Sequence, residues 1–218
     1  MKKYNMGKVV AAAALCLVFA LWTAGVKWLD VQPIGPEGSC VGFSGINGWF
    51  HRLTGVHWTL YDLTDWLGLV PIGTALAFAG LGLGQWIRRK KLSRVDRSLF
   101  VLGGFYVVVA AAYVMFEKVV SNYRPVLVNG ILEASYPSST TLLTLCVMPT
   151  AVMQLRGRLK NNRLRKWLNA GIYAFTALMV IGRLLSGVHW LSDILGGMIF
   201  STAMVLLYEF AAEQIENR

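Results

Sequence analysis

The sequence predicts an all-α, polytopic membrane protein with six transmembrane helices and both termini in the cytoplasm. Three observations lead to this fold class. The 218-residue chain is 56% hydrophobic and only 15% charged, which makes it more apolar than an ordinary soluble domain. Its apolar residues gather in six long stretches, and its basic residues gather in short blocks between them. Because no repeat or low-complexity segment divides the chain, a single domain over residues 1–218 is expected.

Each apolar stretch is long enough to cross a bilayer, which takes about 20 residues in a helix. Aromatic residues such as Trp28, Trp66 and Trp190 stand near several ends of these stretches. Amphipathic rings prefer the membrane interface, so their positions support the assignment. The predicted spans are residues 9–29, 66–87, 98–116, 138–155, 168–185 and 191–208.

Positive charges are divided unequally between the two sides of the membrane. One set of connections carries sixteen Lys and Arg residues, and the other carries five. Cytoplasmic connections retain positive charge, which places both termini inside and residues 30–65, 117–137 and 186–190 outside. Topology therefore accounts for the net charge of +10, and nucleic-acid binding is set aside. Short connections and a compact chain favour a bacterial plasma membrane.

The longest external connection, residues 30–65, begins as a loop that is rich in Pro and Gly. From residue 48 to residue 66, a mixture of aromatic and polar side chains predicts one helix that lies at the membrane interface.

No metal ion or cofactor is predicted. The three cysteines, Cys16, Cys40 and Cys146, stand far apart and form no metal or redox motif. His51 and His57 are six residues apart, so they do not share a helix face, and no further ligand pattern accompanies them.

The external side carries one group of residues whose spacing indicates chemistry. His189 and Asp193 are four residues apart, so on a helix the carboxylate can hold one imidazole nitrogen while the other points at a substrate. This is the arrangement of an activated histidine nucleophile or base. Arg183 stands six residues before His189, across a Ser-Gly break, and can offer a two-pronged grip on phosphate oxygens. The alternative is a buried His-Asp pair without a catalytic role.

Two further external segments favour a phosphate site. Lys118 and Arg124 bring cations to the mouth of the third span, where Pro125 ends any helix. Hydroxyl groups and free backbone N–H groups stand at the start of the fourth span, and a helix N-terminus attracts anions. These hydroxyl residues are Ser138, Ser139 and Thr140. The same residues also fit an ordinary N-cap.

Three short motifs in these segments resemble those of the type 2 phosphatidic acid phosphatase superfamily. They are Arg124-Pro125, Pro137-Ser138-Ser139 and Arg183-x5-His189-x3-Asp193. The family patterns are K-x6-R-P, P-S-G-H and S-R-x5-H-x3-D, and the resemblance covers residues 99–208. It implies a six-span core and a reaction without metal, in which His189 forms a phosphohistidine and Asp193 orients it. Lys118, Arg124, Arg183 and the Ser138–Thr140 segment would bind the phosphate.

The chain departs from these patterns at three positions. Thr140 replaces a histidine that is thought to protonate the leaving group, and a hydroxyl cannot act as an acid near neutral pH. Glu117 stands where the first motif has lysine, with Lys118 one position further on. Gly182 replaces a serine before Arg183. His51, His57 or Glu133 could supply the missing proton.

Three hypotheses follow from this sequence. The first is a phosphatase that hydrolyses a phosphomonoester or pyrophosphate of a lipid at the outer leaflet through His189. The second is a weakly active or non-catalytic relative that binds or transports a phosphorylated lipid. The third is a phosphotransferase with a lipid acceptor. An oriented nucleophile favours an enzyme, because a binding site has little need of one.

Overall fold

The structure is a computed structural model that describes residues 6–216, and residues 1–5 and 217–218 lie outside the described part. The latter include Lys2, Lys3 and Arg218, which contributed to the predicted orientation. The described chain is helical, and its strand-like contacts are isolated bridges in loops. The helices are α1 (Met6–Trp28), α2 (Ser44–Thr54), α3 (Trp58–Leu67), α4 (Leu69–Arg89), α5 (Arg97–Lys118), α6 (Ser139–Arg158), α7 (Asn162–Leu185) and α8 (Leu191–Glu216), with short 3-10 turns η1 (Pro36–Gly38) and η2 (Leu92–Arg94).

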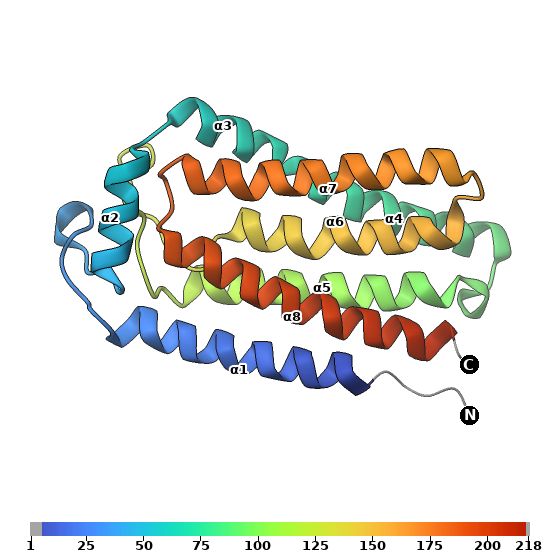
Figure 1. Ribbon diagram of the computed structural model, residues 1–218. Coiled ribbons are helices and arrows are strands. Elements are labelled where there is room, and N and C mark those ends of the chain that lie inside the picture. Colours follow the sequence, from blue (N-terminus) through green and yellow to red (C-terminus); the bar gives the residue numbers. More distant parts are fainter. Residues whose placement is uncertain (1–5, 217–218) are drawn as a thin grey trace.

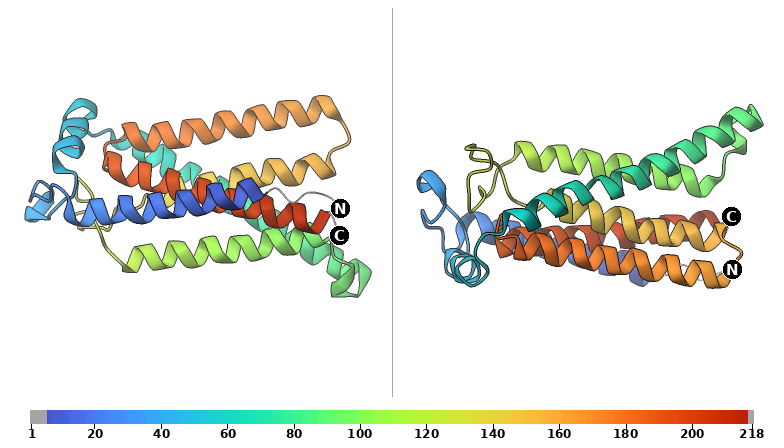
Figure 2. Two further views of the ribbon diagram at one scale, coloured as in Figure 1. Left: turned by 60° about the horizontal axis from the view of Figure 1, so that its bottom comes forward. Right: turned by 90° about the horizontal axis from the view of Figure 1, so that it is seen from above.

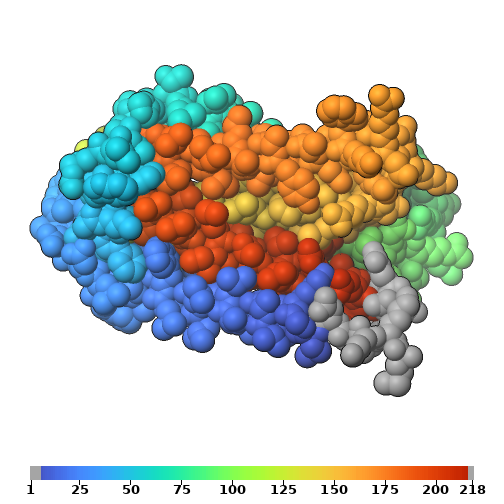
Figure 3. All heavy atoms as spheres, in the orientation of Figure 1, coloured from blue at the N-terminus to red at the C-terminus, as the bar shows by residue number. Residues whose placement is uncertain are grey.

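The long helices α1 and α4 to α8 run side by side, and the short helices α2 and α3 lie at one end of this bundle (Figure 1). Helix α6 is central, because it contacts α4, α5, α7 and α8. The space-filling view shows α6 between α7 and α8 on one face, with α1 packed along α8 (Figure 3). Helix α4 diverges from α6 and α7 as it approaches η2 (Figure 2). The described start of α1 and the described end of α8 lie at the same end of the bundle.

Within residues 6–216, five helical segments are long and apolar enough to cross a membrane by length and composition: α1, Trp58–Arg89, α5, α7 and Leu191–Ile215. The all-helical prediction is confirmed, and these segments support a multi-pass membrane protein. The predicted fourth span, α6, is not among them. Its Thr141, Thr144 and Thr150 are buried, and the hydroxyl of Thr150 donates to the carbonyl of Cys146 at 2.9 Å. A helix surrounded by other helices can carry such groups, so a sixth crossing stays a prediction.

The prediction of one interfacial helix over residues 48–66 is wrong. The chain forms two helices, because α2 ends at Gly55, where φ is +67°, and α3 begins at Trp58. Helix α3 then passes directly into α4 at Gly68. The composition predicted an amphipathic helical segment. The positive φ of Gly55 divides this segment into α2 and α3 and lets α3 turn toward the bundle.

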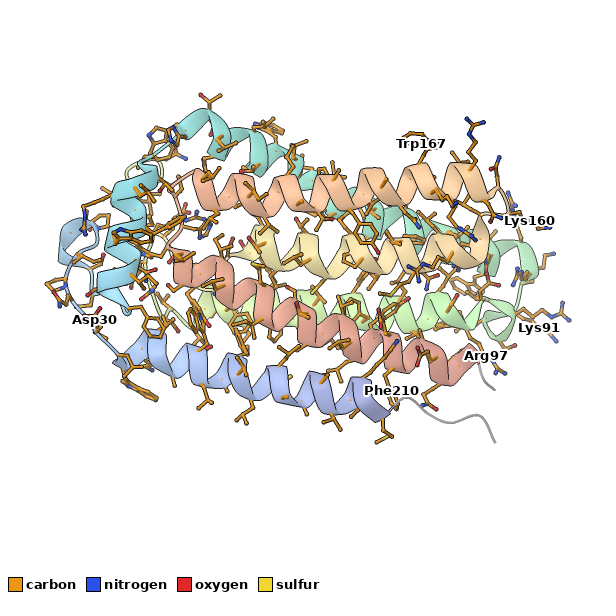
Figure 4. The ribbon with its side chains drawn as sticks, viewed as in Figure 1. Asp30, Lys91, Arg97, Lys160, Trp167 and Phe210 are labelled. Atoms are coloured by element: carbon orange, nitrogen blue, oxygen red, sulfur yellow. The ribbon has the colours of Figure 1, made fainter. Side chains whose placement is uncertain are left out.

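The two ends of the bundle differ in charge. Figure 4 shows Lys91, Arg97 and Lys160 at the end that holds the α4–α5 and α6–α7 connections, while Asp30 lies at the opposite end beside α2. Large apolar side chains are exposed along the sides of the bundle, among them Leu17 on α1 and Val107 on α5. This pattern suits helices that face lipid between two polar ends. Which end faces the cytoplasm stays a prediction.

Helix α2 is fastened to the start of α8 by one buried side chain. The Asn47 amide donates to the carbonyl oxygen of Gly42 (2.7 Å) and to the hydroxyl of Ser192 (2.9 Å). Its oxygen accepts a hydrogen bond from the backbone N–H of Ser192 at 3.0 Å. Trp22 on α1 donates to the carbonyl of Ser192 at 3.1 Å. Asn47 therefore supplies partners for groups at the N-terminus of α8 that the helix itself cannot satisfy.

We expect Asn47→Ala to lower the free energy of unfolding by about 1–3 kcal/mol, because it leaves buried polar groups without partners. Thermal unfolding of the detergent-purified protein measures this effect. Ile46→Ala is the matched control, since Ile46 is the neighbouring residue on α2 and is 51% exposed. Equal stability of the two variants would contradict the proposed role of Asn47.

Candidate active site

His189 lies in the turn between α7 and α8, not on a helix as its spacing to Asp193 predicted. Helix α7 ends at Leu185, and α8 begins after His189. The turn passes through Gly187, whose φ is +68° and where a Cβ atom would lie 1.8 Å from the carbonyl oxygen of Gly55. A residue with a side chain would clash there, so this glycine allows the turn to place His189 over the start of α8.

The structure brings Asp193 next to His189 by a different route from the one predicted. Asp193 lies in the first turn of α8, and its Oδ2 accepts a hydrogen bond from the backbone N–H of Trp190 at 2.9 Å. The same oxygen lies 3.6 Å from His189 Nδ1. That distance is electrostatic contact rather than a hydrogen bond. Both side chains are buried, so the carboxylate acts on the ring without screening by water.

Two guanidinium groups converge on the other ring nitrogen. His189 Nε2 lies 3.1 Å from Arg124 Nη1 and 3.2 Å from Arg183 Nη2. Arg183 belongs to the last turn of α7, while Arg124 lies in the loop after α5. A guanidinium can only donate, so Nε2 accepts, and this network assigns the ring proton to Nδ1 on the side of Asp193. The predicted group of Arg124, Arg183, His189 and Asp193 is therefore assembled in space.

The environment keeps His189 neutral. Burial lowers the pKa of His189 well below its ordinary value, and the charges of Arg124 and Arg183 lower it further. Each cation opposes an added proton because like charges repel at short range. A neutral imidazole with a free electron pair on Nε2 is the form in which histidine acts as a nucleophile.

The residues at the start of α6 differ in whether they face the site. The backbone N–H of Ser138 donates to the carbonyl of Asp193 at 3.1 Å, and the Ser138 hydroxyl accepts from Thr141 at 3.1 Å. Ser138 is fully buried; its hydroxyl bonds to the first turn of α6, while its backbone N–H ties the start of α6 to α8. Ser139 lines a small cavity together with His189, and Thr140 lines a larger groove beside Arg183. Ser139 and Thr140 are thus the members of this predicted group that face open space.

The end of α5 presents Glu117 to the site rather than Lys118. Glu117 lines the small cavity with His189 and also the groove that contains Arg124 and Arg183. Lys118 is exposed at the last residue of α5 and lines neither of these spaces. A phosphate contact by Lys118 stays a prediction.

Helix α3 contributes residues that the sequence did not single out. The ring of Tyr61 lies 4.7 Å from Arg183 Cζ and 5.9 Å from Arg124 Cζ. One turn further along α3, Asp65 Oδ1 lies 3.5 Å from Arg183 Nη1. The i, i+4 spacing of Tyr61 and Asp65 was the available signal, since it places both on one helix face. The segment was interpreted as interfacial because its aromatic residues fit that role equally well.

Of the three residues considered as proton donors, only Glu133 contacts the site. Its carboxylate lies 3.0 Å from Arg124 Nε. His57 Nε2 bonds with the carbonyl of Thr54 at 2.9 Å, and the ring of His51 packs edge-on against Trp190. Neither histidine lines the two cavities beside His189.

A long groove opens from the site along the bundle. It has a volume of about 1470 Å³ and includes Arg124 and Arg183 at one end. Apolar side chains of α4 and α5 form much of its length, among them Leu76, Leu83 and Val107. The groove continues to Trp86 and Leu92, near the opposite end of α4. It can therefore accommodate an apolar chain whose polar end lies between the two arginines.

No cluster of three or more His, Cys, Asp or Glu side chains that could hold a metal ion occurs within residues 6–216. The positive charge at the site comes from the two guanidinium groups.

Comparison with known proteins places this geometry in a family. Residues 105–214 match the PAP2 superfamily, which covers half of the chain. The chain belongs to the PAP2 superfamily. No curated protein sequence matches it. Among solved structures, it resembles the crystal structure described as the first transmembrane PAP2-type phosphatidylglycerolphosphate phosphatase from Bacillus subtilis, with 19% identity and a TM-score of 0.54 over 93% of this chain and 96% of that chain. At this identity the likeness shows a shared fold.

Two departures from the PAP2 motifs lie against α3. A Cβ atom on Gly182 would lie 2.7 Å from Cγ2 of Thr64, which is fully buried. One turn further on, at the residue that follows α3, a Cβ atom on Gly68 would lie 3.5 Å from Cγ2 of Thr140. The absence of a side chain at Gly182 allows α3 to approach α7 closely. That approach carries Asp65 to Arg183.

We expect His189 to titrate below pH 6.5, because burial and two neighbouring cations disfavour the imidazolium form. Replacing Arg124 with Gln removes one of these cations and should raise the pKa. NMR of isotope-labelled histidine in detergent measures both values, and the chain has only three histidines to assign. His51→Gln and His57→Gln provide the assignments. An unchanged His189 titration in Arg124→Gln would refute this account of its electrostatics.

The close contact of α3 with α7 predicts coupling between Gly182 and Thr64. Ala at position 182 gains about 1 kcal/mol of helix propensity over Gly, but its methyl group must displace the Thr64 methyl, and overpacking costs about 1–3 kcal/mol. Thr64→Ser removes that methyl group and keeps the hydroxyl. Gly182→Ala should therefore stabilise the protein only in the Thr64→Ser background. A double-mutant cycle of thermal unfolding measures the coupling, and additive effects would argue against a docked α3.

Proposed function

We propose that this protein is a membrane lipid-phosphate phosphatase that hydrolyses a phosphomonoester or pyrophosphate of a lipid through a phosphohistidine intermediate. One observation carries the proposal. Nε2 of the buried, neutral His189 faces two guanidinium groups, while Nδ1 faces Asp193. A nucleophile thus lies where a phosphate group is most strongly attracted.

In the first step, the electron pair on Nε2 attacks phosphorus, and the bond from phosphorus to the leaving oxygen breaks. Arg124 and Arg183 turn their N–H groups from Nε2 to the phosphate oxygens, whose charge grows toward the transition state. Arg183 Nε is available for this, since it is buried and has no hydrogen-bond partner among residues 6–216. Asp193 stabilises the positive charge that develops on the ring.

In the second step, water attacks the phosphohistidine, the bond from Nε2 to phosphorus breaks, and inorganic phosphate leaves. His189 returns to its neutral form with its proton on Nδ1. The two guanidinium groups supply the positive charge throughout, so this mechanism requires no metal ion or other cofactor.

The groove beside the site supports a phosphorylated lipid as the substrate. Its polar end contains both arginines, and its apolar walls run between α4 and α5. The end of α7 and the start of α8, which carry the site, lie at the end of the bundle opposite the α4–α5 and α6–α7 connections, which are rich in Lys and Arg (Figures 1 and 4). With those connections in the cytoplasm, the chain crosses the membrane six times, both termini are cytoplasmic, and the reaction occurs on the external side of a bacterial plasma membrane.

A specific observation favours the second hypothesis, a weakly active or non-catalytic protein that binds a phosphorylated lipid. Asp65 and Glu133 already pair with the two arginines, and Thr140 offers no acid. A phosphate must displace these carboxylates, so a relative that binds or moves a phosphorylated lipid with little catalysis is the alternative. A phosphotransferase would use the same His189 intermediate and pass the phosphate to a lipid alcohol.

The test is release of phosphate by detergent-purified protein in the presence of a chelator. The substrates are phosphatidic acid, phosphatidylglycerophosphate and undecaprenyl diphosphate. We expect His189→Ala to lower release by on the order of 10⁴-fold or more, because the nucleophile is lost. Alkaline quenching of the wild type with labelled substrate should trap label on His189.

His57→Ala is the matched control, because His57 is an exposed histidine that does not line the cavities at the site. Equal release by wild type and His189→Ala on every substrate, from folded protein that still binds lipid, would exclude the phosphatase and leave the binding protein. Label transferred to an added lipid alcohol rather than to water would identify a phosphotransferase.

A further inference from the structure

Transfer of a phosphate group from an ester requires a proton donor that the central group of residues does not supply. Attack by Nε2 of His189 leaves the departing oxygen on the far side of phosphorus, roughly in line with the attacking nitrogen. Asp193 lies behind the ring, next to Nδ1. An alkoxide is a poor leaving group unless an acid protonates it. The donor must therefore come from the wall of the site that faces His189 across the bound phosphate.

Asp65 is the carboxylate most directly joined to the nucleophile. One guanidinium group contacts both residues through its two terminal nitrogens: Arg183 Nη2 lies 3.2 Å from His189 Nε2, and Arg183 Nη1 lies 3.5 Å from Asp65 Oδ1. A phosphate bound on Arg183 beside His189 would therefore lie next to Asp65. The Asp65 side chain is 58% exposed, so water can reach it.

The C-terminal half of α3 holds Asp65 in this position, because the chain is closely packed just before and just after this residue. Gly182 leaves space for Thr64, the residue before Asp65, which is fully buried. Gly68, three residues after Asp65, approaches Thr140 at the start of α6. The carboxylate thus stands between α7 and α6, on the groove that both helices line.

The two other carboxylates near the site are less well placed. Glu133 meets Arg124 through Nε, whereas Nη1 of that guanidinium contacts His189. Glu117 lines the cavity next to His189 and Ser139, but no contact joins it to Arg124 or Arg183 among the hydrogen bonds and ion pairs of the described chain. Glu117 and Glu133 are the alternative proton donors, and the experiment tests each of them by substitution.

We propose that Asp65 is the acid–base residue of this site. The inference rests on the proposed phosphatase function. When a phosphate takes the N–H groups of Arg183, the displaced carboxylate faces a second anion, and like charges at short range favour the uptake of a proton. The carboxyl O–H gives this proton to the leaving oxygen as the bond from phosphorus to that oxygen breaks and the bond from Nε2 to phosphorus forms. The resulting carboxylate then takes a proton from the water that attacks the phosphohistidine.

The experiment compares two substrates with alkyl chains of equal length, an alkyl phosphate and a nitrophenyl phosphate that carries the chain on its ring. The alkoxide requires a proton, whereas the nitrophenolate leaves without one. We expect Asp65→Asn to lower hydrolysis of the alkyl phosphate by about 10²- to 10⁴-fold and that of the nitrophenyl phosphate far less. Asp65→Glu keeps the carboxyl group, so the ratio of the two rates should stay near that of the wild type.

Asp62→Asn is the matched control, because Asp62 is an exposed acid one turn away on α3 and does not line the groove. Equal loss on both substrates in Asp65→Asn would show that Asp65 only positions Arg183 and would overturn the inference. A change of ratio in Asp65→Glu as large as in Asp65→Asn would overturn it too. So would a selective loss on the alkyl phosphate in Glu117→Gln or Glu133→Gln but not in Asp65→Asn. Failure of the proposed function is distinct, since the wild type would then show no phosphate release that depends on His189.

Discussion

The convergence of two guanidinium groups on one imidazole nitrogen is the constraint on which this structure depends. Arg124 and Arg183 each lie within 3.2 Å of His189 Nε2, and all three side chains are buried. Two like charges at such proximity are unfavourable away from water unless anions compensate them. Asp193 lies on the far side of the ring, while Asp65 and Glu133 pair with the guanidinium groups themselves. Under the proposed function, a phosphate replaces these paired carboxylates, because it offers negative charge with more oxygen acceptors.

Holding this group together requires the ends of several helices to meet at one place. The three residues come from the loop after α5, the end of α7 and the turn before α8. The start of α8 is the meeting point: its Ser192 bonds with Asn47 of α2, and its Asp193 carbonyl accepts from the N–H of Ser138 before α6. Trp190 also donates to the carbonyl of Tyr123 at 2.7 Å, next to Arg124. Hydrogen bonds at this end of the bundle and apolar packing along the helices together position the site.

Helix α3 connects the site to the lipid-sized groove. It brings Tyr61 over both guanidinium groups and Asp65 onto Arg183, and it continues into α4, which forms one wall of the groove. Glycine at position 182 allows this packing, because any side chain there would meet Thr64. Gly182 departs from the family motif, and α3 lies outside residues 105–214, the part of the chain that matches the family. The two nevertheless pack against each other.

Composition and charge spacing predicted the helical class, the long apolar helices and most of the residues that gather at the site. The spacing of the motifs in the sequence identified Arg124, Arg183, His189 and Asp193. It did not predict their geometry, since the His-Asp pair forms across a turn at Gly187 and a helix N-terminus rather than along a helix face. The division of residues 48–66 at Gly55 and the arrival of Tyr61 and Asp65 at the arginines also required the tertiary structure. Local sequence determines which segments are apolar enough to be helices in a membrane. Contacts between segments far apart in the chain depend on close packing, which single positions such as Gly182 and Gly187 permit and which no local pattern records.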